Sequence, residues 1–209
     1  MKGIQESIKT SLSGFDPGSV IFPNDFRSLG SEDAIKMSLS RLVRRGDLKR
    51  IAHGIYYKPY IDPVLGEVTP SAEAIAINLA EREKVRIRPT GIFAMHKLGL
   101  SKQVPTNLVY LTDGHPRKLK IGKVNVQFKA TTPKRMALSG PISGPLILAL
   151  EEMDIEHINE ETEKKILALL EHEQRGNIIS DLRLAKGKIY DYLMRLLKQI
   201  DDLFTYTIH

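Results

Sequence analysis

Three residues have types and a spacing that would suit metal-dependent hydrolysis of nucleic acid. Asp113 follows an alternating apolar segment, and Gln127 and Lys129 lie together in another. In such an active site carboxylates hold Mg²⁺ while a lysine assists the attacking water, and Glu73 offers a second carboxylate. However, Gln127 is a poor substitute for a metal-binding acid, and Asp113 with the glycine after it is also a typical hairpin turn. A metal-dependent nuclease is therefore the less favoured alternative.

The other residue types argue against further catalytic or metal-binding sites. The sequence contains six histidines and no cysteine, which excludes disulfides and thiolate metal sites, and no two histidines have the spacing of a zinc-binding helix motif. It also lacks a glycine-rich phosphate loop and a Gly-x-Ser-x-Gly nucleophile elbow. We therefore expect no metal, no cofactor and no enzymatic activity.

Basic residues are concentrated in the first 150 positions. That stretch holds 23 lysines and arginines against 12 acids, whereas residues 151–209 hold 8 against 13, and the net charge is +6. Such segregation favours a polyanion-binding body with an acidic helical tail. No apolar run has the length of a signal peptide or a membrane span. We expect a cytoplasmic protein whose polyanion is double-stranded DNA.

One cluster of these basic residues lies on a segment with well-marked helical ends. Ser31 is a typical N-cap followed by two acids, and Arg45 precedes the glycine expected after the last turn. Apolar residues share one face of this helix, so the other face is free to enter a major groove. The residues expected on that face are Lys36, Ser40 and Arg41, as base contacts, and Arg44 and Arg45, as phosphate contacts.

Two helices are expected before this one. Ile4, Ile8 and Leu12 recur every four residues, as the buried stripe of a helix does. Pro23 suits the first position of a short second helix, because proline lacks the N–H that would go unpaired there. The helix over residues 31–45 is then the third.

A basic hairpin is expected after the third helix. Residues 48–57 form two β-rich runs around Gly54. Near the tip, Lys49, Arg50 and His53 can meet the DNA backbone or a minor groove. Three helices followed by such a hairpin predict a winged helix-turn-helix DNA-binding domain over residues 1–60.

The same region resembles a known family. Residues 34–57 are similar to the N-terminal domain of AbiEi-type antitoxins, the transcriptional autoregulators of type IV toxin–antitoxin systems, and the closest segment reads LSRLVRRGDLKRIAHGIYYKP. The segment PTGIFAMHKLGLSKQVPTNLVYLTDG resembles the middle of these proteins. The resemblance implies repression of the protein's own operator, antitoxin activity in the C-terminal domain, and a nucleotidyltransferase-type toxin as functional partner. A winged-helix regulator with no toxin partner is the alternative.

The rest of the chain is expected to form one mixed domain. Residues 60–70 read as a linker, and residues 70–209 as an α+β domain with a small antiparallel sheet and C-terminal helices. The expected strands are 85–87, 107–112, 119–121 and 123–128, and the expected helices are 71–83, 91–98, 146–153, 159–172 and 178–204. With the N-terminal domain, the whole chain is expected to belong to the α+β class.

A second basic surface is expected within this domain. Residues 115–135 contain seven lysines and arginines and no acid. Alternation along a strand places side chains two residues apart on one face, where they can contact phosphates. The residues expected to do so are Arg117, Lys118 and Lys120.

Overall fold

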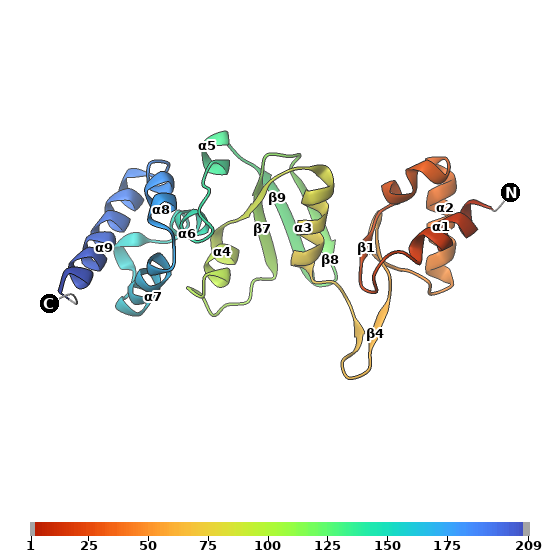
Figure 1. Ribbon diagram of the computed structural model, residues 1–209, viewed down its shortest axis with the longest axis horizontal. Helices are drawn as coiled ribbons and strands as arrows, with labels where there is room; N and C mark the ends of the chain where they lie inside the picture. Colours follow the sequence, from red (N-terminus) through yellow and green to blue (C-terminus); the bar gives the residue numbers. More distant parts are fainter. Residues whose placement is uncertain (1–2, 207–209) are drawn as a thin grey trace. The chain divides into compact units, whose positions relative to one another are not determined.

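The computed structural model describes the backbone of residues 3–206 and the side chains of residues 3–199. It contains both helices and sheets, as expected of the α+β class (Figure 1). The chain divides into two compact units, residues 1–79 with 119–124 and residues 80–118 with 125–209. Within the described part of the chain, none of the helices combines the length and the apolar character needed to span a membrane.

Three helices supply most of the core of the first unit. They are α1 (Ile4–Leu12), the 3₁₀ helix η1 (Pro23–Leu29) and α2 (Glu32–Arg44). Ile8, Phe26 and Leu39 are completely buried in one cluster, as the helical spacing of the apolar residues predicted. All three helices lie where the sequence placed them.

A three-stranded sheet completes this core. Its strands, in spatial order, are β1 (Val20–Ile21), β3 (Ile55–Tyr57) and β2 (Lys49–Ala52), and both pairings are antiparallel. β2 and β3 are the two predicted runs, joined at Gly54, whose φ of +68° suits a residue without a Cβ. β1 was not predicted, because two residues are too short to show an alternating pattern.

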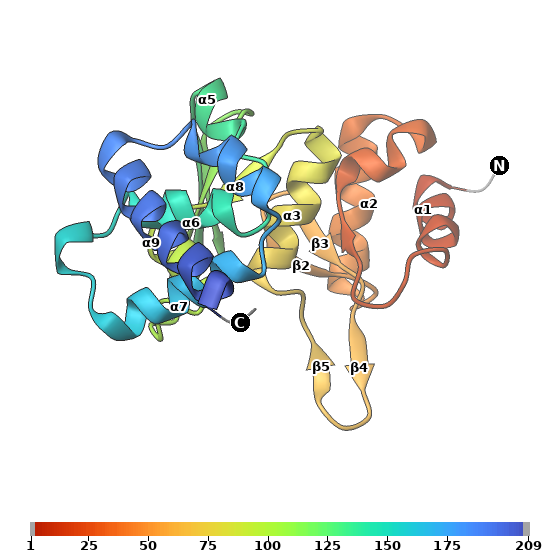
Figure 2. The ribbon, with the colours of Figure 1, turned by 60° about the vertical axis from the view of Figure 1, so that its left-hand side comes forward.

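A second hairpin occupies the stretch expected to be a linker. β4 (Tyr60–Asp62) and β5 (Gly66–Val68) form a separate two-stranded antiparallel sheet, which extends beyond β2 and β3 in Figure 2. Asp62 Oδ1 accepts hydrogen bonds from the N–H groups of Val64 and Leu65 (2.8 and 2.9 Å). The proline and glycine that indicated a linker instead shape a tight turn.

The largest sheet has four strands. In spatial order they are β6 (Ile87–Pro89), β7 (Asn107–Thr112), β9 (Val124–Ala130) and β8 (Arg117–Ile121). β6 and β7 are antiparallel, but β7 and β9 are parallel, with Tyr110 opposite Phe128. The expectation of a wholly antiparallel sheet here was therefore wrong. β8 lies at the edge, so β9 returns beside β7 and runs in the same direction.

The remaining helices lie in the second half of the chain, apart from those that follow β5 and β6. They are α3 (Ala72–Glu83), α4 (Gly91–Lys97), α5 (Pro133–Met136), α6 (Ser143–Leu150), η2 (Ile155–His157), α7 (Glu160–Glu171), α8 (Arg175–Leu182) and α9 (Gly187–Tyr206). α6 is buried along almost its whole length, which explains why its sequence is apolar on every face.

The single long helix predicted over residues 178–204 is wrong. The structure has two helices there, α8 and α9. The N–H groups of Leu184 and Ala185 bond back to the carbonyls of Asp181 and Leu182 (2.9 and 3.0 Å), which closes α8 in a tight turn. The apolar periodicity continues on both sides of this turn, so the pattern alone did not reveal it.

Two buried acids hold the start of α6. Asp181 accepts hydrogen bonds from the N–H groups of Ser139 and Gly140 (2.7 and 2.9 Å) and from Ser143 Oγ (2.7 Å). Glu173 Oε2 accepts from the N–H groups of Ile142 and Ser143 (2.7 and 3.1 Å). These carboxylates therefore satisfy backbone donors that a helix start leaves unpaired.

Candidate nucleic-acid interface

Helix α2 presents a basic face that is fixed from behind by the core. Ser31 Oγ accepts the N–H of Ala34 (3.4 Å), so the predicted N-cap is present. Ile35 and Leu39 are buried on the inner face. The outer face consists of exposed residues, and those predicted there are Lys36, Ser40, Arg41, Arg44 and Arg45, all of which are exposed.

These basic side chains differ in what they already bind. Lys36 forms an ion pair with Glu32, one turn earlier, and Arg45 Nε lies 3.3 Å from Asp47 Oδ2. Within the part of the chain that the structure describes, no ion pair involves the side chain of Arg41 or Arg44. These two arginines are therefore the most available cations on α2.

The tip of the β2–β3 hairpin is held by its own side chains. Arg50 Nε donates to the carbonyl of Ala52 (3.2 Å), and Arg50 Nη2 lies 3.0 Å from His53 Nδ1. Both side chains are exposed. The structure thus brings Arg50 and His53 together, as the sequence predicted for a hairpin tip, and fixes their position relative to the turn.

Lys49, the remaining predicted residue of this hairpin, is paired with an acid from β5. Glu67 binds Lys49 Nζ through Oε2 and accepts a hydrogen bond from Tyr57 through Oε1 (2.6 Å). The bond from Lys49 has the larger effect and the bond from Tyr57 the smaller, and together they hold the pKa of Glu67 below its ordinary value. Burial, together with this carboxylate, raises the pKa of Tyr57 to about 12. Sequence reasoning missed Glu67, because it was assigned to a linker.

Arg27 is a second residue that the sequence analysis did not select. It is exposed in the last turn of η1 and lies near enough to Glu32 to lower the pKa of that carboxyl slightly, after the larger effect of Lys36. The helix that precedes a recognition helix crosses the DNA backbone in helix-turn-helix proteins. The second helix was predicted over residues 22–26, and the position of Arg27 directly after it was the signal that could have identified it.

The three residues of the second predicted basic surface differ in what they already bind. Arg117 is engaged by Glu83 through two hydrogen bonds of 2.7 Å, and its guanidinium lies 5.2 Å from the centre of the Phe128 ring. Lys118 and Lys120 are exposed on β8. Of these three residues, the two lysines are the ones open to an external anion.

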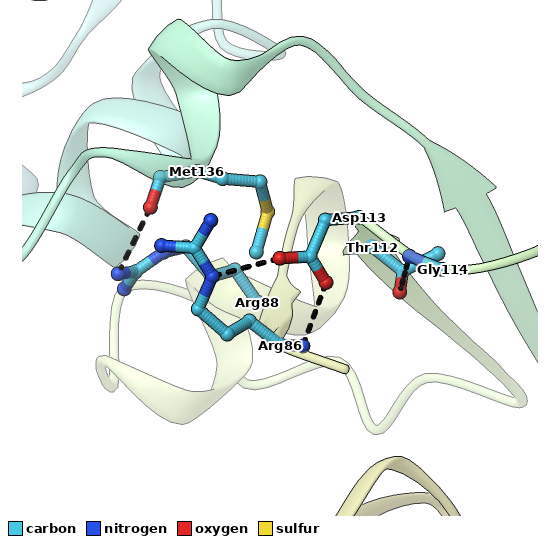
Figure 3. A network of polar contacts seen from close by, with 6 residues as sticks. All are labelled: Arg86, Arg88, Thr112, Asp113, Gly114 and Met136. Carbon is cyan, nitrogen blue, oxygen red and sulfur yellow. Dashed lines mark hydrogen bonds and ion pairs between the residues drawn. The ribbon is translucent and has the colours of Figure 1, made fainter. Parts of the chain in front are cut away.

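The residues weighed for metal-dependent hydrolysis have other bonds in the structure. Both oxygens of Asp113 accept hydrogen bonds from Arg86, one from its backbone N–H (2.7 Å) and one from Nε (2.8 Å) (Figure 3). The Arg86 side chain thereby holds the pKa of Asp113 below its ordinary value. Next to this pair, Arg88 Nη2 donates to the carbonyl of Met136 (3.4 Å).

The other members of that set lie on separate elements. In the β7–β9 pairing Gln127 lies opposite Val109 and Lys129 opposite Leu111, so neither is paired directly with Asp113, and Glu73 lies on α3. Among the described residues there is no group of three or more histidines and acids placed to hold a metal ion. The arrangement offers a clearer binding surface on α2 and the β2–β3 hairpin than it does at Asp113.

Comparison with known proteins gives a family and no function. Residues 4–178 match the model of a family described as a family of unknown function, DUF6088. No curated protein matches the chain. The matched stretch includes α2, the β2–β3 hairpin and the four-stranded sheet, so the family covers parts of both units.

Proposed function

For this chain, which belongs to the DUF6088 family of unknown function, we propose a role as a DNA-binding transcriptional repressor in the cytoplasm. The observation that carries the proposal is the outer face of α2, where exposed cations and a serine stand on a helix whose inner face is locked in the core. The order of elements from α1 to β3, with the sheet order β1-β3-β2, is the order that we expect of a winged helix-turn-helix, and it supports the same role.

The proposal assigns separate tasks to the basic residues. Lys36, Ser40 and Arg41 contact base edges in the major groove, and the cations that flank them contact phosphates, which position the protein without reading sequence. Arg41 and Arg44 form no ion pair in the described part of the chain, so they can make these contacts without breaking one. The phosphate contacts are Arg44, Arg45, Lys49, Arg50 and His53, with Lys118 and Lys120 as a second set.

To contact DNA, some of these side chains must break an ion pair with an acidic residue and bind a phosphate instead. Lys36, Arg45 and Lys49 all carry exposed ion pairs. Such pairs contribute about 0–1 kcal/mol each, whereas hydrogen bonds between charged groups and phosphates are stronger and are accompanied by counterion release. The exchange therefore costs little. Arg117 is a weaker candidate, because both of its bonds to Glu83 would have to break.

The resemblance to AbiEi-type antitoxins supports a more specific form of the proposal. In this form the DNA is the protein's own operator, the second unit carries antitoxin activity, and the functional partner is a nucleotidyltransferase-type toxin. A winged-helix regulator without a toxin is the alternative. A nucleotidyltransferase gene beside this one would favour the antitoxin, and its absence would favour the general regulator.

Fluorescence anisotropy on duplex DNA tests the proposed function. One duplex carries the region upstream of the protein's own gene and the other a shuffled sequence of the same composition, and both are titrated across a salt series without Mg²⁺. Tighter binding to the upstream duplex that persists as salt rises is expected. Equal binding that disappears with salt would show only a nonspecific basic surface and would refute operator recognition.

A further inference from the structure

The partly buried guanidinium of Arg88, on β6, has few of its hydrogen bonds made within the described part of the chain. Its bond to the carbonyl of Met136 is long, at 3.4 Å from Nη2 (Figure 3). Its Nε is buried and has no hydrogen-bond partner among the described residues. Burial of this charge lowers the pKa of Arg88. Because a buried cation is costly unless an anion accompanies it, the surroundings of Arg88 favour the binding of an anion.

Asp181 acts on Arg88 through its charge, but it does not bind the guanidinium. It raises the pKa of Arg88 by less than burial lowers it. Its oxygens already accept hydrogen bonds from the N–H groups of Ser139 and Gly140 (2.7 and 2.9 Å) and from Ser143 Oγ (2.7 Å). In the described structure no ion pair joins Asp181 to Arg88. The donors of this arginine are therefore left for another acceptor.

Arg86 supplies a second guanidinium on the same side of the sheet. It stands two residues before Arg88, and side chains two residues apart along an extended chain share one face. In Figure 3 both side chains extend on the side where Met136 lies. The charge of Arg86 is near enough to lower the pKa of Arg88 further, after the larger effect of burial. The two like charges repel each other, and an anion between them would relieve that repulsion.

Asp113 holds Arg86 from one side only. Its two oxygens accept hydrogen bonds from Nε of Arg86 (2.8 Å) and from the backbone N–H of the same residue (2.7 Å). No hydrogen bond within the described residues uses the two Nη groups of Arg86, and 64% of this side chain is exposed. The Nη groups are thus held in position and open to solvent. A ligand can reach them without displacing Asp113.

We infer that Arg86 and Arg88 together bind a phosphate group through their Nη groups. A guanidinium presents its N–H groups as a flat fork that pairs with two acceptor oxygens. A carboxylate fills one such fork, whereas a phosphate group carries more oxygens and can bond to both arginines. The inference goes beyond the proposed function, because neither arginine is among the residues assigned to DNA.

Isothermal titration calorimetry of the full chain with inorganic phosphate tests this inference, with the ionic strength held constant by sodium chloride. The wild type is expected to bind phosphate saturably, and acetate is expected to bind about tenfold more weakly or less. Arg86→Gln and Arg88→Met should each weaken phosphate binding by about tenfold or more, because each removes charge-assisted hydrogen bonds. Arg86 is exposed, so its variant tests the inference even if Arg88→Met does not fold.

The matched control is Arg195→Gln. Arg195 lies on α9, is 52% exposed and is paired with Glu163 (3.0 Å), so its replacement removes the same charge from a similar environment. This variant should bind phosphate as the wild type does. The Nε–H signal of Arg88 in a proton–nitrogen NMR spectrum gives a second readout, since that group is buried. Phosphate is expected to shift this signal in the wild type and in the control.

Anisotropy on a duplex without terminal phosphates separates two sources of the phosphate group. Weaker duplex binding by Arg86→Gln and Arg88→Met than by Arg195→Gln would assign the site to a nucleic-acid backbone. Equal duplex binding, with phosphate binding lost, would assign it to a free phosphate compound.

Three results would overturn the inference. They are a wild type that does not bind phosphate saturably, an Arg86→Gln variant that binds phosphate as tightly as the wild type, and an Arg88 Nε–H signal that phosphate does not move. Operator preference is measured separately, so the proposed function can hold or fail whichever result is found here.

Discussion

Tyr57 and Glu67 are joined by a hydrogen bond of 2.6 Å, and the same carboxylate holds Lys49 through its other oxygen. A residue of β5 thus neutralises a cation of β2 that we propose as a phosphate contact. Its effect on DNA binding can be separated from its effect on structure, because glutamine keeps an acceptor for Tyr57 but carries no charge.

We therefore expect Glu67→Gln to bind DNA more tightly than the wild type. Releasing Lys49 adds about one phosphate contact, which steepens the dependence of log affinity on log salt concentration by about 0.9. Anisotropy across a salt series measures both quantities. Glu160→Gln, which removes one negative charge from α7, controls for net charge. Affinity and slope equal to those of the control would contradict the prediction, as would an equal gain in a Lys49→Ala background.

Substitutions of Arg41 and Arg50 are expected to affect DNA binding in different ways. Arg41→Ala removes a proposed base contact from α2, so the preference for the operator over a shuffled duplex should fall by about 1–3 kcal/mol. Arg50→Ala removes a proposed phosphate contact from the hairpin tip, so both duplexes should weaken equally and the salt slope should decrease by about 1. Lys164→Ala, on α7, is the control. Unchanged binding in both arginine variants would mean that the interface is wrongly assigned.

A side chain at Gly140 is expected to destabilise the protein. A Cβ there would lie 2.0 Å from Ser143 Oγ and 2.8 Å from Asp181 Oδ2, inside the buried hydrogen-bonded cluster. Gly140→Ala should therefore lower the free energy of unfolding by about 1–3 kcal/mol. At Gly176, in α8, an added Cβ would meet nothing within 4 Å beyond its chain neighbours and the backbone of its own helix, so Gly176→Ala should raise the free energy of unfolding by about 0.8–1 kcal/mol. Urea denaturation measures both, and equal effects would refute the packing argument.

Glu173 is expected to make the free energy of unfolding depend on pH. Burial raises its pKa, but hydrogen bonds from Asn177 and from the N–H groups of Ile142, Ser143 and Gln174 outweigh burial and hold the pKa below its ordinary value. A carboxyl with a lowered pKa in the folded state stabilises the protein above the unfolded pKa of about 4.3, and this contribution is lost as the pH falls further.

The comparison of wild type with Glu173→Gln tests this assignment. At neutral pH the variant should be about 1–3 kcal/mol less stable, because the buried N–H groups lose a charged acceptor. Below about pH 4.3 the wild type should lose stability faster than the variant, and the two unfolding free energies should converge. Parallel pH profiles in urea denaturation would show that Glu173 does not titrate as described.

The sequence predicted the first unit better than the second for a physical reason. Helices α1 and α2 have apolar residues at regular spacing, and α2 has ends marked by Ser31 and Gly46, so local chemistry determined both. The same applies to the face of α2 that carries Lys36 and Arg41. What Lys49 binds was less predictable, because Glu67 lies 18 residues away and reaches Lys49 only after the chain has folded.

In the second unit the decisive contacts join distant residues. The parallel pairing of β7 and β9 depends on where β8 lies, and spacing alone does not encode that position. The turn between α8 and α9 lies next to Asp181, whose carboxylate bonds to Gly140, 41 residues away. A buried acid in a helical segment was the only local sign of this arrangement, and periodicity of apolar residues does not detect it.

Residues 119–124 belong to the first unit, although residues 80–118 of the second unit precede them in the chain. This order affects how the first unit folds during translation. A ribosome that has released Leu79 must still deliver 45 more residues before this unit is complete, which takes roughly two to nine seconds at about 5–20 residues per second. During that interval the nascent N-terminal unit lacks part of its own chain. Final folding of the unit that carries α2 is therefore coupled to translation of the part of the chain that follows it.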